Sequence, residues 1–202
     1  HELFQGGDKE AYNMSTDIFV VDTPFLIAKL EEEAAKEEPR KLRYVLRDLA
    51  VAENAFAYEY TGYLSNIHSV KAYFDANLDM LESHKFYKLF APNQKVYTKV
   101  KNEEPTYYSD SSEVKLSQFA SGSIVRGKVE NSVISRNVDL SEGSSVSHSI
   151  LFPRVKVAKG ATVEYAIVDK GVEIAEGVTI RGTENNPVVI KKGSVVTEDI
   201  VR

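Results

Sequence analysis

The C-terminal half of the chain contains a single histidine, His148, in the segment Val146-Ser-His-Ser-Ile-Leu151. A histidine often acts as the general base when a protein activates a hydroxyl or an amine for acyl transfer. The positions 17 residues before and after it hold Asn131 and Tyr165. Because this position accepts different polar groups, we expect His148 to face outwards and to take no part in catalysis.

A second feature with chemical potential is a group of basic residues in the same half: Arg126, Lys128, Arg136, Arg154 and Lys156. Guanidinium and ammonium groups bind phosphate through charge-assisted hydrogen bonds. If these residues gather on neighbouring structural units, they form a site for a phosphorylated effector, with Arg126, Lys128 and Arg136 as its candidate residues. The alternative is an ordinary solvated surface, because acidic residues lie among them, namely Glu130, Asp139 and Glu142.

The element that positions these residues is a repeat, because aliphatic residues recur every 17 positions in four columns. The columns are Val129, Val146, Val163 and Ile180; Val133, Ile150 and Ile167; Val138, Val155 and Val172; and Leu140, Val157 and Ile174. A period kept in several columns indicates one unit stacked on copies of itself. An inner step of six residues, rich in Val, Ile, Ser and Gly, predicts short strands on three faces of each coil.

This pattern predicts a parallel β-helix whose coils lie about 4.8 Å apart, with the aliphatic columns stacked in its interior. About four to five coils fit the sequence. The pattern fades before Val129, where residues 114–126 are expected to form one imperfect entry coil, and residues 183–187 are expected to bulge from the last coil. Gly143, Gly160 and Gly177 also recur every 17 residues, and we expect them at corners that require a tight turn or a positive φ angle.

The first half of the chain has a different character, and its patterns predict an α/β fragment. The expected order is a strand at 17–21, a helix over 24–34 capped by Thr23, a helix over 42–49, a strand at 55–60, and a helix that begins at Ser69. We divide the chain into an α/β part (1–83), a linker (84–112) and the β-helix (113–202).

Composition excludes several classes of function. The net charge of −5, with acidic and basic residues interleaved, offers no basic face for nucleic acid. There is no cysteine, which excludes a disulfide framework, a thiolate metal site and a cysteine nucleophile. We find no apolar run long enough to span a membrane and no signal peptide. We therefore expect a cytoplasmic protein without a membrane partner.

Two segments carry a resemblance to a known family. They are Gly62-Tyr-Leu-Ser-Asn-Ile-His-Ser-Val70 and Ser121-Gly-Ser-Ile-Val-Arg-Gly-Lys-Val-Glu-Asn-Ser-Val-Ile134. Together they resemble glucose-1-phosphate adenylyltransferase (ADP-glucose pyrophosphorylase) over roughly residues 12–195. The resemblance implies the end of a Rossmann-like nucleotidyltransferase domain, followed by a left-handed β-helix of hexapeptide repeats. Because the chain begins with His1, we expect it to be a fragment of such a protein.

The chain departs from this family where the family binds substrate and metal. Catalytic members read Gly-Tyr-Trp-Arg-Asp-Val-Gly-Thr, and the aspartate, a metal-binding carboxylate, is replaced here by Asn66. Mg²⁺ prefers hard, anionic oxygen ligands, so the neutral amide keeps the shape and loses the charge. Asn13-Met-Ser-Thr-Asp17 replaces a sugar-contacting turn, which makes Ser15 a vestigial substrate residue like Asn66. We therefore expect no catalytic residue, metal ligand or cofactor in this chain, whereas the parent family uses Mg²⁺.

The resemblance implies a regulatory subunit that does not itself catalyse the reaction. Such a subunit modulates the synthesis of ADP-glucose for glycogen within a hetero-oligomer, with a catalytic subunit of the same family and a phosphorylated metabolite as its partners. One alternative is an active sugar-phosphate nucleotidyltransferase that takes its metal ligands from elsewhere. Another is a hexapeptide-repeat acyltransferase that uses acetyl-coenzyme A.

Overall fold

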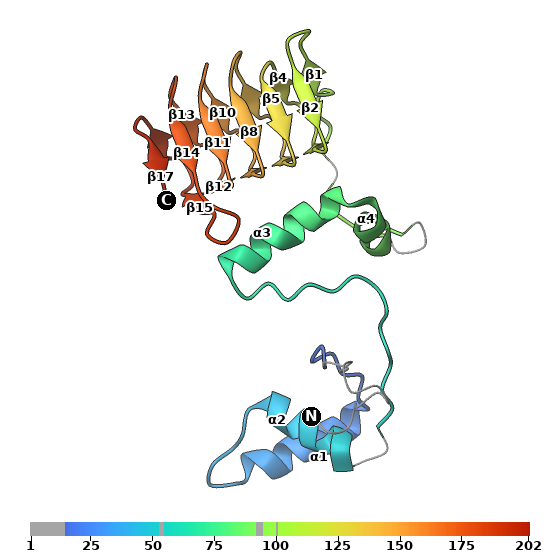
Figure 1. Ribbon diagram of the computed structural model, residues 1–202. Helices are drawn as coiled ribbons and strands as arrows, with labels where there is room; N and C mark the ends of the chain where they lie inside the picture. The colour runs from blue at the N-terminus through green and yellow to red at the C-terminus, as the bar shows by residue number, and fades with distance from the viewer. Residues whose placement is uncertain (1–14, 53–54, 92–94, 100) are drawn as a thin grey trace, which may run out of the picture. The chain divides into compact units, whose positions relative to one another are not determined.

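A computed structural model describes residues 15–52, 55–91, 95–99 and 101–202 of the chain (Figure 1). The chain divides into two compact units, residues 1–60 and residues 61–202. The first unit contains helices α1 (Thr23–Ala34) and α2 (Leu42–Ala52). The second contains the helices α3 (Val70–Leu78), η2 (Asp79–Leu81) and α4 (Ser83–Leu89), followed by the β-helix. None of the helices in these ranges has the length and apolar character that a membrane span requires.

The two helices of the first unit confirm the sequence prediction. The cap is one residue earlier than predicted: the Asp22 carboxylate, and not Thr23, accepts a hydrogen bond from the Phe25 backbone N–H at 3.1 Å, and Thr23 is the first residue of α1. Glu33, near the end of α1, is buried and accepts hydrogen bonds from the Arg40 side chain, which also contacts Asp48 of α2. This network of charged groups connects the turn between the helices to both of them.

The strands predicted at 17–21 and 55–60 are wrong, because both segments are irregular in the structure. Their apolar side chains are exposed, including Ile18, Val20, Phe56 and Tyr58. A strand exists only where another strand accepts and donates its backbone hydrogen bonds, and the described residues of the first unit contain no strand.

The β-helix is confirmed and has about six coils, more than the four to five predicted. Their short strands form three parallel sheets, two with six strands and one with five. Sheet 1 contains β1 (Tyr107–Tyr108), β4 (Ile124–Val125), β7 (Asp139–Leu140), β10 (Lys156–Val157), β13 (Glu173–Ile174) and β16 (Val195–Val196). Sheet 2 contains β2 (Glu113–Lys115), β5 (Lys128–Glu130), β8 (Ser145–Ser147), β11 (Thr162–Glu164), β14 (Thr179–Arg181) and β17 (Ile200–Val201). Sheet 3 contains β3 (Gln118–Phe119), β6 (Val133–Ile134), β9 (Ile150–Leu151), β12 (Ala166–Val168) and β15 (Val188–Ile190).

The spacing between coils explains where the sequence pattern weakens. Glu113 pairs with Lys128, 15 positions later, whereas Lys128 pairs with Ser145, 17 positions later. The first step on this face is therefore two residues shorter than the regular repeat, which hides the first coil from a search for a fixed period. At the C-terminal end of the β-helix, the predicted bulge at residues 183–187 is confirmed. Within it, Thr183 and Asn186 pair in an isolated antiparallel β-bridge.

Three of the four predicted columns lie in the interior, where Val146, Val155 and Val157 are at most 1% exposed. The column of Val133, Ile150 and Ile167 lies instead on the outside of sheet 3. Successive residues of a strand point to opposite faces, so the interior positions of this sheet belong to their neighbours Ile134, Leu151 and Val168. The corner glycines are confirmed, because Gly143, Gly160 and Gly177 have φ angles of 70°, 69° and 71°.

We call the outward-facing residues of sheet 3 the outer column; they pair in the order Gln118, Val133, Ile150, Ile167 and Val189. Helix α3 covers the middle of this column with Phe74, which is 1% exposed. Aliphatic residues therefore occupy this outward position on three successive coils because a helix packs over the column. The range predicted as a linker contains β1 and all of α4 except its first residue, and the two predicted domain boundaries stay predictions.

Candidate functional site

The segment 63–69, which we call the Asn66 loop, leads directly into α3 and contains Asn66, the residue that the sequence predicts as a vestigial site residue. Its first residue is held by a hydrogen bond of 2.9 Å from the Tyr63 hydroxyl to Asp79. The Lys85 ammonium lies 2.6 Å from Asp79 and 2.7 Å from Glu82, and these two carboxylates raise the pKa of Lys85. Burial, followed by the bond to Asp79, raises the pKa of Tyr63. These contacts fix the start of the loop against η2 and α4.

The end of the Asn66 loop is held by the start of α3. The Ser69 hydroxyl accepts a hydrogen bond from the Ala72 N–H at 3.1 Å and caps the helix, as the sequence predicts. The Asn66 backbone carbonyl accepts from the His68 N–H at 3.1 Å and lies 3.0 Å from the His68 Nδ1 atom. Asn66 itself is exposed at the surface of a loop that is anchored at both ends.

The residues at this loop do not fit a Mg²⁺ ion. The ion needs anionic oxygen ligands, whereas the loop offers the neutral amide of Asn66 and the imidazole of His68. Across the described ranges, no three Asp, Glu, His or Cys residues lie close enough together to hold a metal ion. Ser15, the other vestigial candidate, is exposed in the first unit, and its hydroxyl accepts a hydrogen bond from the Asp17 N–H at 3.2 Å. Its neighbours Asn13 and Met14 lie outside the described residues.

The contact between α3 and the outer column is the largest apolar contact of this region outside the β-helix interior. Phe74 meets Ile150 and Ile167, which are 2% and 6% exposed, and four partly buried residues surround them, namely Tyr73, Leu78, Phe152 and Tyr165. Beside the first turn of α3 lies a hollow of about 410 Å³. It is lined by Ile67, His68, Ser69, Val70, Tyr73, Ile167 and Val189.

The three candidate effector residues lie at different places on the β-helix, and each faces a carboxylate. Arg126 follows β4 and lies 2.9 Å from Asp139, while Lys128 lies in β5, 2.9 Å from Glu113. Arg136 follows β6 and lies 3.8 Å from Glu103. The other two basic residues are Arg154, which is exposed, and Lys156, which lies 2.7 Å from Glu173. Binding of a phosphorylated effector by these residues stays a prediction, and a phosphate there competes with these carboxylates.

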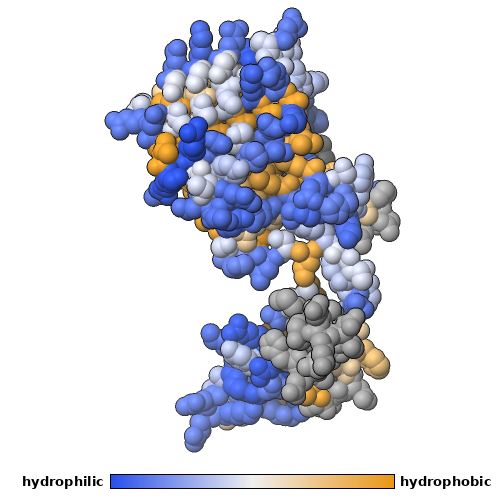
Figure 2. All heavy atoms as spheres, viewed as in Figure 1, coloured by the Kyte–Doolittle hydropathy of each residue, from blue (hydrophilic) through white to orange (hydrophobic). Residues whose placement is uncertain are grey.

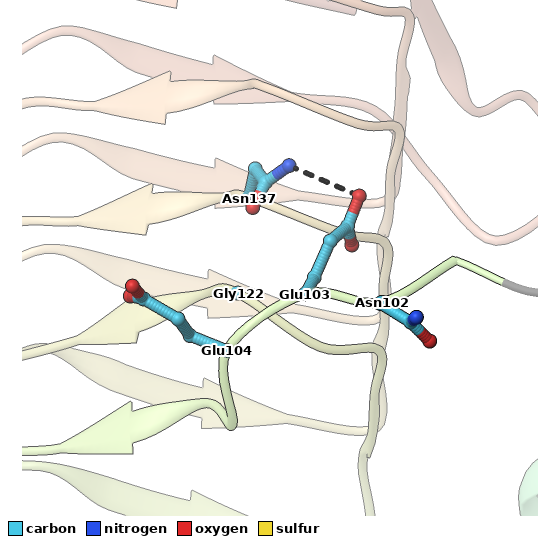
Figure 3. Close-up of a pocket in the computed structure, with 5 residues that line it drawn as sticks. All are labelled: Asn102, Glu103, Glu104, Gly122 and Asn137. Atoms are coloured by element: carbon cyan, nitrogen blue, oxygen red, sulfur yellow. Dashed lines mark hydrogen bonds between the residues drawn. The ribbon is translucent and has the colours of Figure 1, made fainter.

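Glu103 belongs to the segment that precedes the first coil, and it rests against a corner of the β-helix (Figure 3). Its carboxylate accepts hydrogen bonds from the Ser121 hydroxyl at 3.1 Å and from the Asn137 amide at 3.5 Å. A hollow of about 540 Å³ lies here, lined by Asn102, Glu103, Glu104, Gly122 and Asn137. Two carboxylates on its rim make this hollow unfavourable for a phosphorylated ligand.

His148 occupies a corner between sheets 2 and 3 and is half-buried, outside the cluster of residues that fills the β-helix interior. Its ring stacks on that of Tyr165 with centroids 4.8 Å apart, a distance that matches the spacing of the coils. Its Nε2 atom lies 3.2 Å from the Asn131 amide nitrogen, and its Nδ1 atom is buried without a hydrogen-bond partner among the described residues. A general base needs a nitrogen that a substrate reaches, and neither nitrogen meets that need here.

The family model for the GlmU-like C-terminal hexapeptide domain matches residues 101–201. The chain is 34% identical to the glycogen biosynthesis protein GlgD of Bacillus subtilis over 197 residues, which cover 98% of this chain and 55% of that protein. It is 53% identical to GlgD of Geobacillus stearothermophilus over 127 residues, covering 63% of this chain and 37% of the relative.

A catalytic relative also matches. The chain is 31% identical to the glucose-1-phosphate adenylyltransferase of Mycoplasma mobile over 105 residues, 52% of this chain and 27% of that enzyme. The chain thus spans about half the length of the first of these relatives and less of the other two. The hexapeptide domain, the β-helix and these similarities together show that the chain belongs to the glucose-1-phosphate adenylyltransferase family.

Proposed function

We propose that this chain is part of a cytoplasmic regulatory subunit that acts in glycogen biosynthesis and does not itself make ADP-glucose. In this proposal it assembles with a catalytic subunit of the same family, which forms ADP-glucose and pyrophosphate from glucose 1-phosphate and ATP. The regulatory subunit changes the kinetics of that partner, and its β-helix supplies the contacts for assembly and communication.

The observation that carries the proposal is Asn66 at the position of the family's metal-binding aspartate. The loop around it is well anchored, through Tyr63 at one end and Ser69 at the other. In this proposal the anchored loop is what remains of the family's site, and a neutral amide stands where the site needs a negative charge. A metal that neutralises transferring phosphates depends on anionic ligands, so the loss of this carboxylate removes chemistry while leaving the fold.

The relatives support the same conclusion. Two of them carry the name glycogen biosynthesis protein, and one of these aligns with 98% of this chain. The relatives named as the enzyme align with shorter parts, such as 52% of this chain for the one from Mycoplasma mobile. The long alignment with the Bacillus subtilis protein and the 53% identity with the Geobacillus stearothermophilus protein therefore support a likeness to the glycogen biosynthesis proteins over the enzyme.

The ends of the β-helix support a role in assembly. The first coil exposes Val114 and Leu116, and the last exposes Val195 and Val201, each at least 43% exposed. An end coil also has backbone N–H and C=O groups that no further coil pairs, which favours association with another chain. Figure 2 shows apolar residues lying between hydrophilic ones on the visible face of the β-helix.

The proposal is tested by mixing the full-length protein with the catalytic glucose-1-phosphate adenylyltransferase of the same organism. We expect the two proteins to co-elute in size-exclusion chromatography and the mixture to show a changed KM, kcat or effector response for ADP-glucose formation. A matched mixture with an unrelated β-helix protein controls for crowding and for stabilisation of the enzyme. Separate elution together with unchanged kinetics contradicts the proposal.

A further inference from the structure

Helix α3 and the short helix η2 run along the stack of coils rather than across it (Figure 1). At the N-terminal end, Val70 and Tyr73 line a hollow with Ile167 and Val189, which belong to β12 and β15. At the other end, the Met80 carbonyl in η2 accepts a hydrogen bond of 2.5 Å from the side chain of Gln118, in β3. The helical segment is therefore bonded to the first strand of sheet 3 at one end and borders a hollow beside the last strand at the other.

The length of this segment matches the distance that it covers. The helical residues from Val70 to Leu81 rise by about 18 Å at 1.5 Å per residue. From β3 to β15 the sheet has four steps between coils, which at about 4.8 Å each amount to about 19 Å. Phe74 lies between these ends and is packed on Ile150 and Ile167. The helix thus lies against the outer column at both ends and in the middle.

The Asn66 loop is attached to this helical segment at both of its own ends. Tyr63 bonds to Asp79, close to the C-terminal end of the segment, and Ser69 caps its N-terminal end. The loop consequently lies beside the helix and moves with it. The contacts that place the helix on the β-helix therefore also place the loop on it.

We propose that α3 and η2 form a strut, a rigid element that sets the position of the Asn66 loop on the β-helix. When a partner binds the β-helix, the resulting change in the coils alters the position of the loop through the contact between the strut and the outer column. The effect on a partner enzyme rests on the proposed regulatory function, whereas the positioning of the loop does not. A helical segment that packs on β9 and β12 and bonds to β3 cannot keep all of these contacts if the coils rotate relative to one another, because a well-packed apolar contact tolerates little change of shape. A change in the twist of the coils therefore shifts or releases the loop.

The positioning is tested by hydrogen exchange on the full-length protein with Ile150→Ala and with Ile167→Ala. Both residues point away from the β-helix interior, so the interior residues Leu151 and Val168 remain in place. We expect the amides of residues 63–79 to exchange about 10- to 100-fold faster, because the helix loses apolar contacts with the outer column. Val195→Ala is the control, since Val195 is 67% exposed and no helix covers it; it should leave these amides unchanged.

The conservative variant Ile167→Val should fold normally and show a smaller increase in the same amides, which separates the loss of contact from misfolding. Equal exchange of residues 63–79 in the wild type and in all three outer-column variants overturns the strut. The consequence for regulation is measured in the mixture with the partner enzyme. If the wild type and Ile167→Ala change the partner's kinetics equally, the strut does not transmit the regulatory effect to the partner enzyme. If the wild type has no effect, the proposed function fails, while the exchange result still decides the positioning.

Discussion

Replacing Phe74 by alanine should release α3 from the β-helix without unfolding the β-helix itself. The ring is 1% exposed and packs on Ile150 and Ile167, both outside the β-helix interior. Deleting a buried phenylalanine typically lowers stability by about 3–5 kcal/mol, through lost apolar contact and the cavity left behind. Helix α3 has nine residues, and a helix that short is not stable in water without tertiary contacts. The loss of stability should therefore weaken the packing of α3 on the β-helix and leave the β-helix itself folded.

The assay is guanidinium chloride denaturation of the full-length protein, followed by circular dichroism and by hydrogen exchange of residues 69–81. We expect the exchange protection of this segment to disappear at low denaturant in Phe74→Ala while the β-sheet signal keeps its midpoint. Tyr87→Ala is the matched control, because Tyr87 is an aromatic residue on α4 with 65% exposure, and it should change stability by less than about 0.5 kcal/mol. A loss of less than about 1 kcal/mol in Phe74→Ala, with protection of residues 69–81 intact, refutes the reasoning.

Three further predictions concern other parts of the chain. Ser149→Ala should lower the free energy of unfolding by about 1–3 kcal/mol in thermal denaturation. The reason is that the buried Ser149 hydroxyl accepts a hydrogen bond from the Ala166 N–H at 3.1 Å. Ser111→Ala, at an exposed position, is the control. Lys156→Glu should lower the melting temperature at low salt and less at 1 M salt, since Lys156 lies between Asp139 and Glu173 in sheet 1; an equal loss at both salt concentrations contradicts an electrostatic cause. Hydrogen bonds from Arg40, then Lys36, hold the pKa of Glu33 well below its usual value of 4.5, so its contribution is present above pH 4.5 and is lost as the pH falls towards the folded-state pKa. The helices α1 and α2 should therefore lose circular dichroism signal in acid, and Glu33→Gln should make that signal less dependent on pH.

The interior of the β-helix was predictable because a constant coil spacing places one residue of each coil in the same surroundings. Val129, Val146 and Val163 follow from this directly, since they pair in register. The outer column escaped correct placement because Val133 and Ile134 are both aliphatic and nothing in the repeat says which of them points inwards. That distinction depends on Phe74, which is distant in the sequence and covers the outer residues.

The elements that depend on contacts between distant residues were the ones that local patterns missed. The bond between Tyr63 and Asp79 joins residues 16 positions apart and leaves no periodic signal. The first coil was predicted only as an imperfect one, because Glu113 pairs with Lys128 at a shorter step than the regular repeat. The strand predicted at 55–60 rested on alternating residues alone, whereas a strand needs a partner.

At the candidate site, too, the residue types could be predicted from the sequence, whereas the contacts between distant residues could not. Asn66 stands out in the sequence because the substitution changes the chemistry of one position in a recognisable motif. The basic residues stood out by type, but their surroundings depend on the register of the coils, which places Asp139 beside Arg126 and Glu113 beside Lys128. Once the register is known, most of these ion pairs can be read from residues one coil apart.

The most direct test of the central claim is to measure ADP-glucose formation by the full-length protein alone, with glucose 1-phosphate, ATP and Mg²⁺. Because a neutral amide stands where the family holds its metal, we predict no turnover above background for the wild type, under conditions in which a catalytic relative is active. The Asn66→Asp variant, measured alongside, shows whether the carboxylate alone restores activity. Substantial turnover by the wild-type protein contradicts a purely regulatory role.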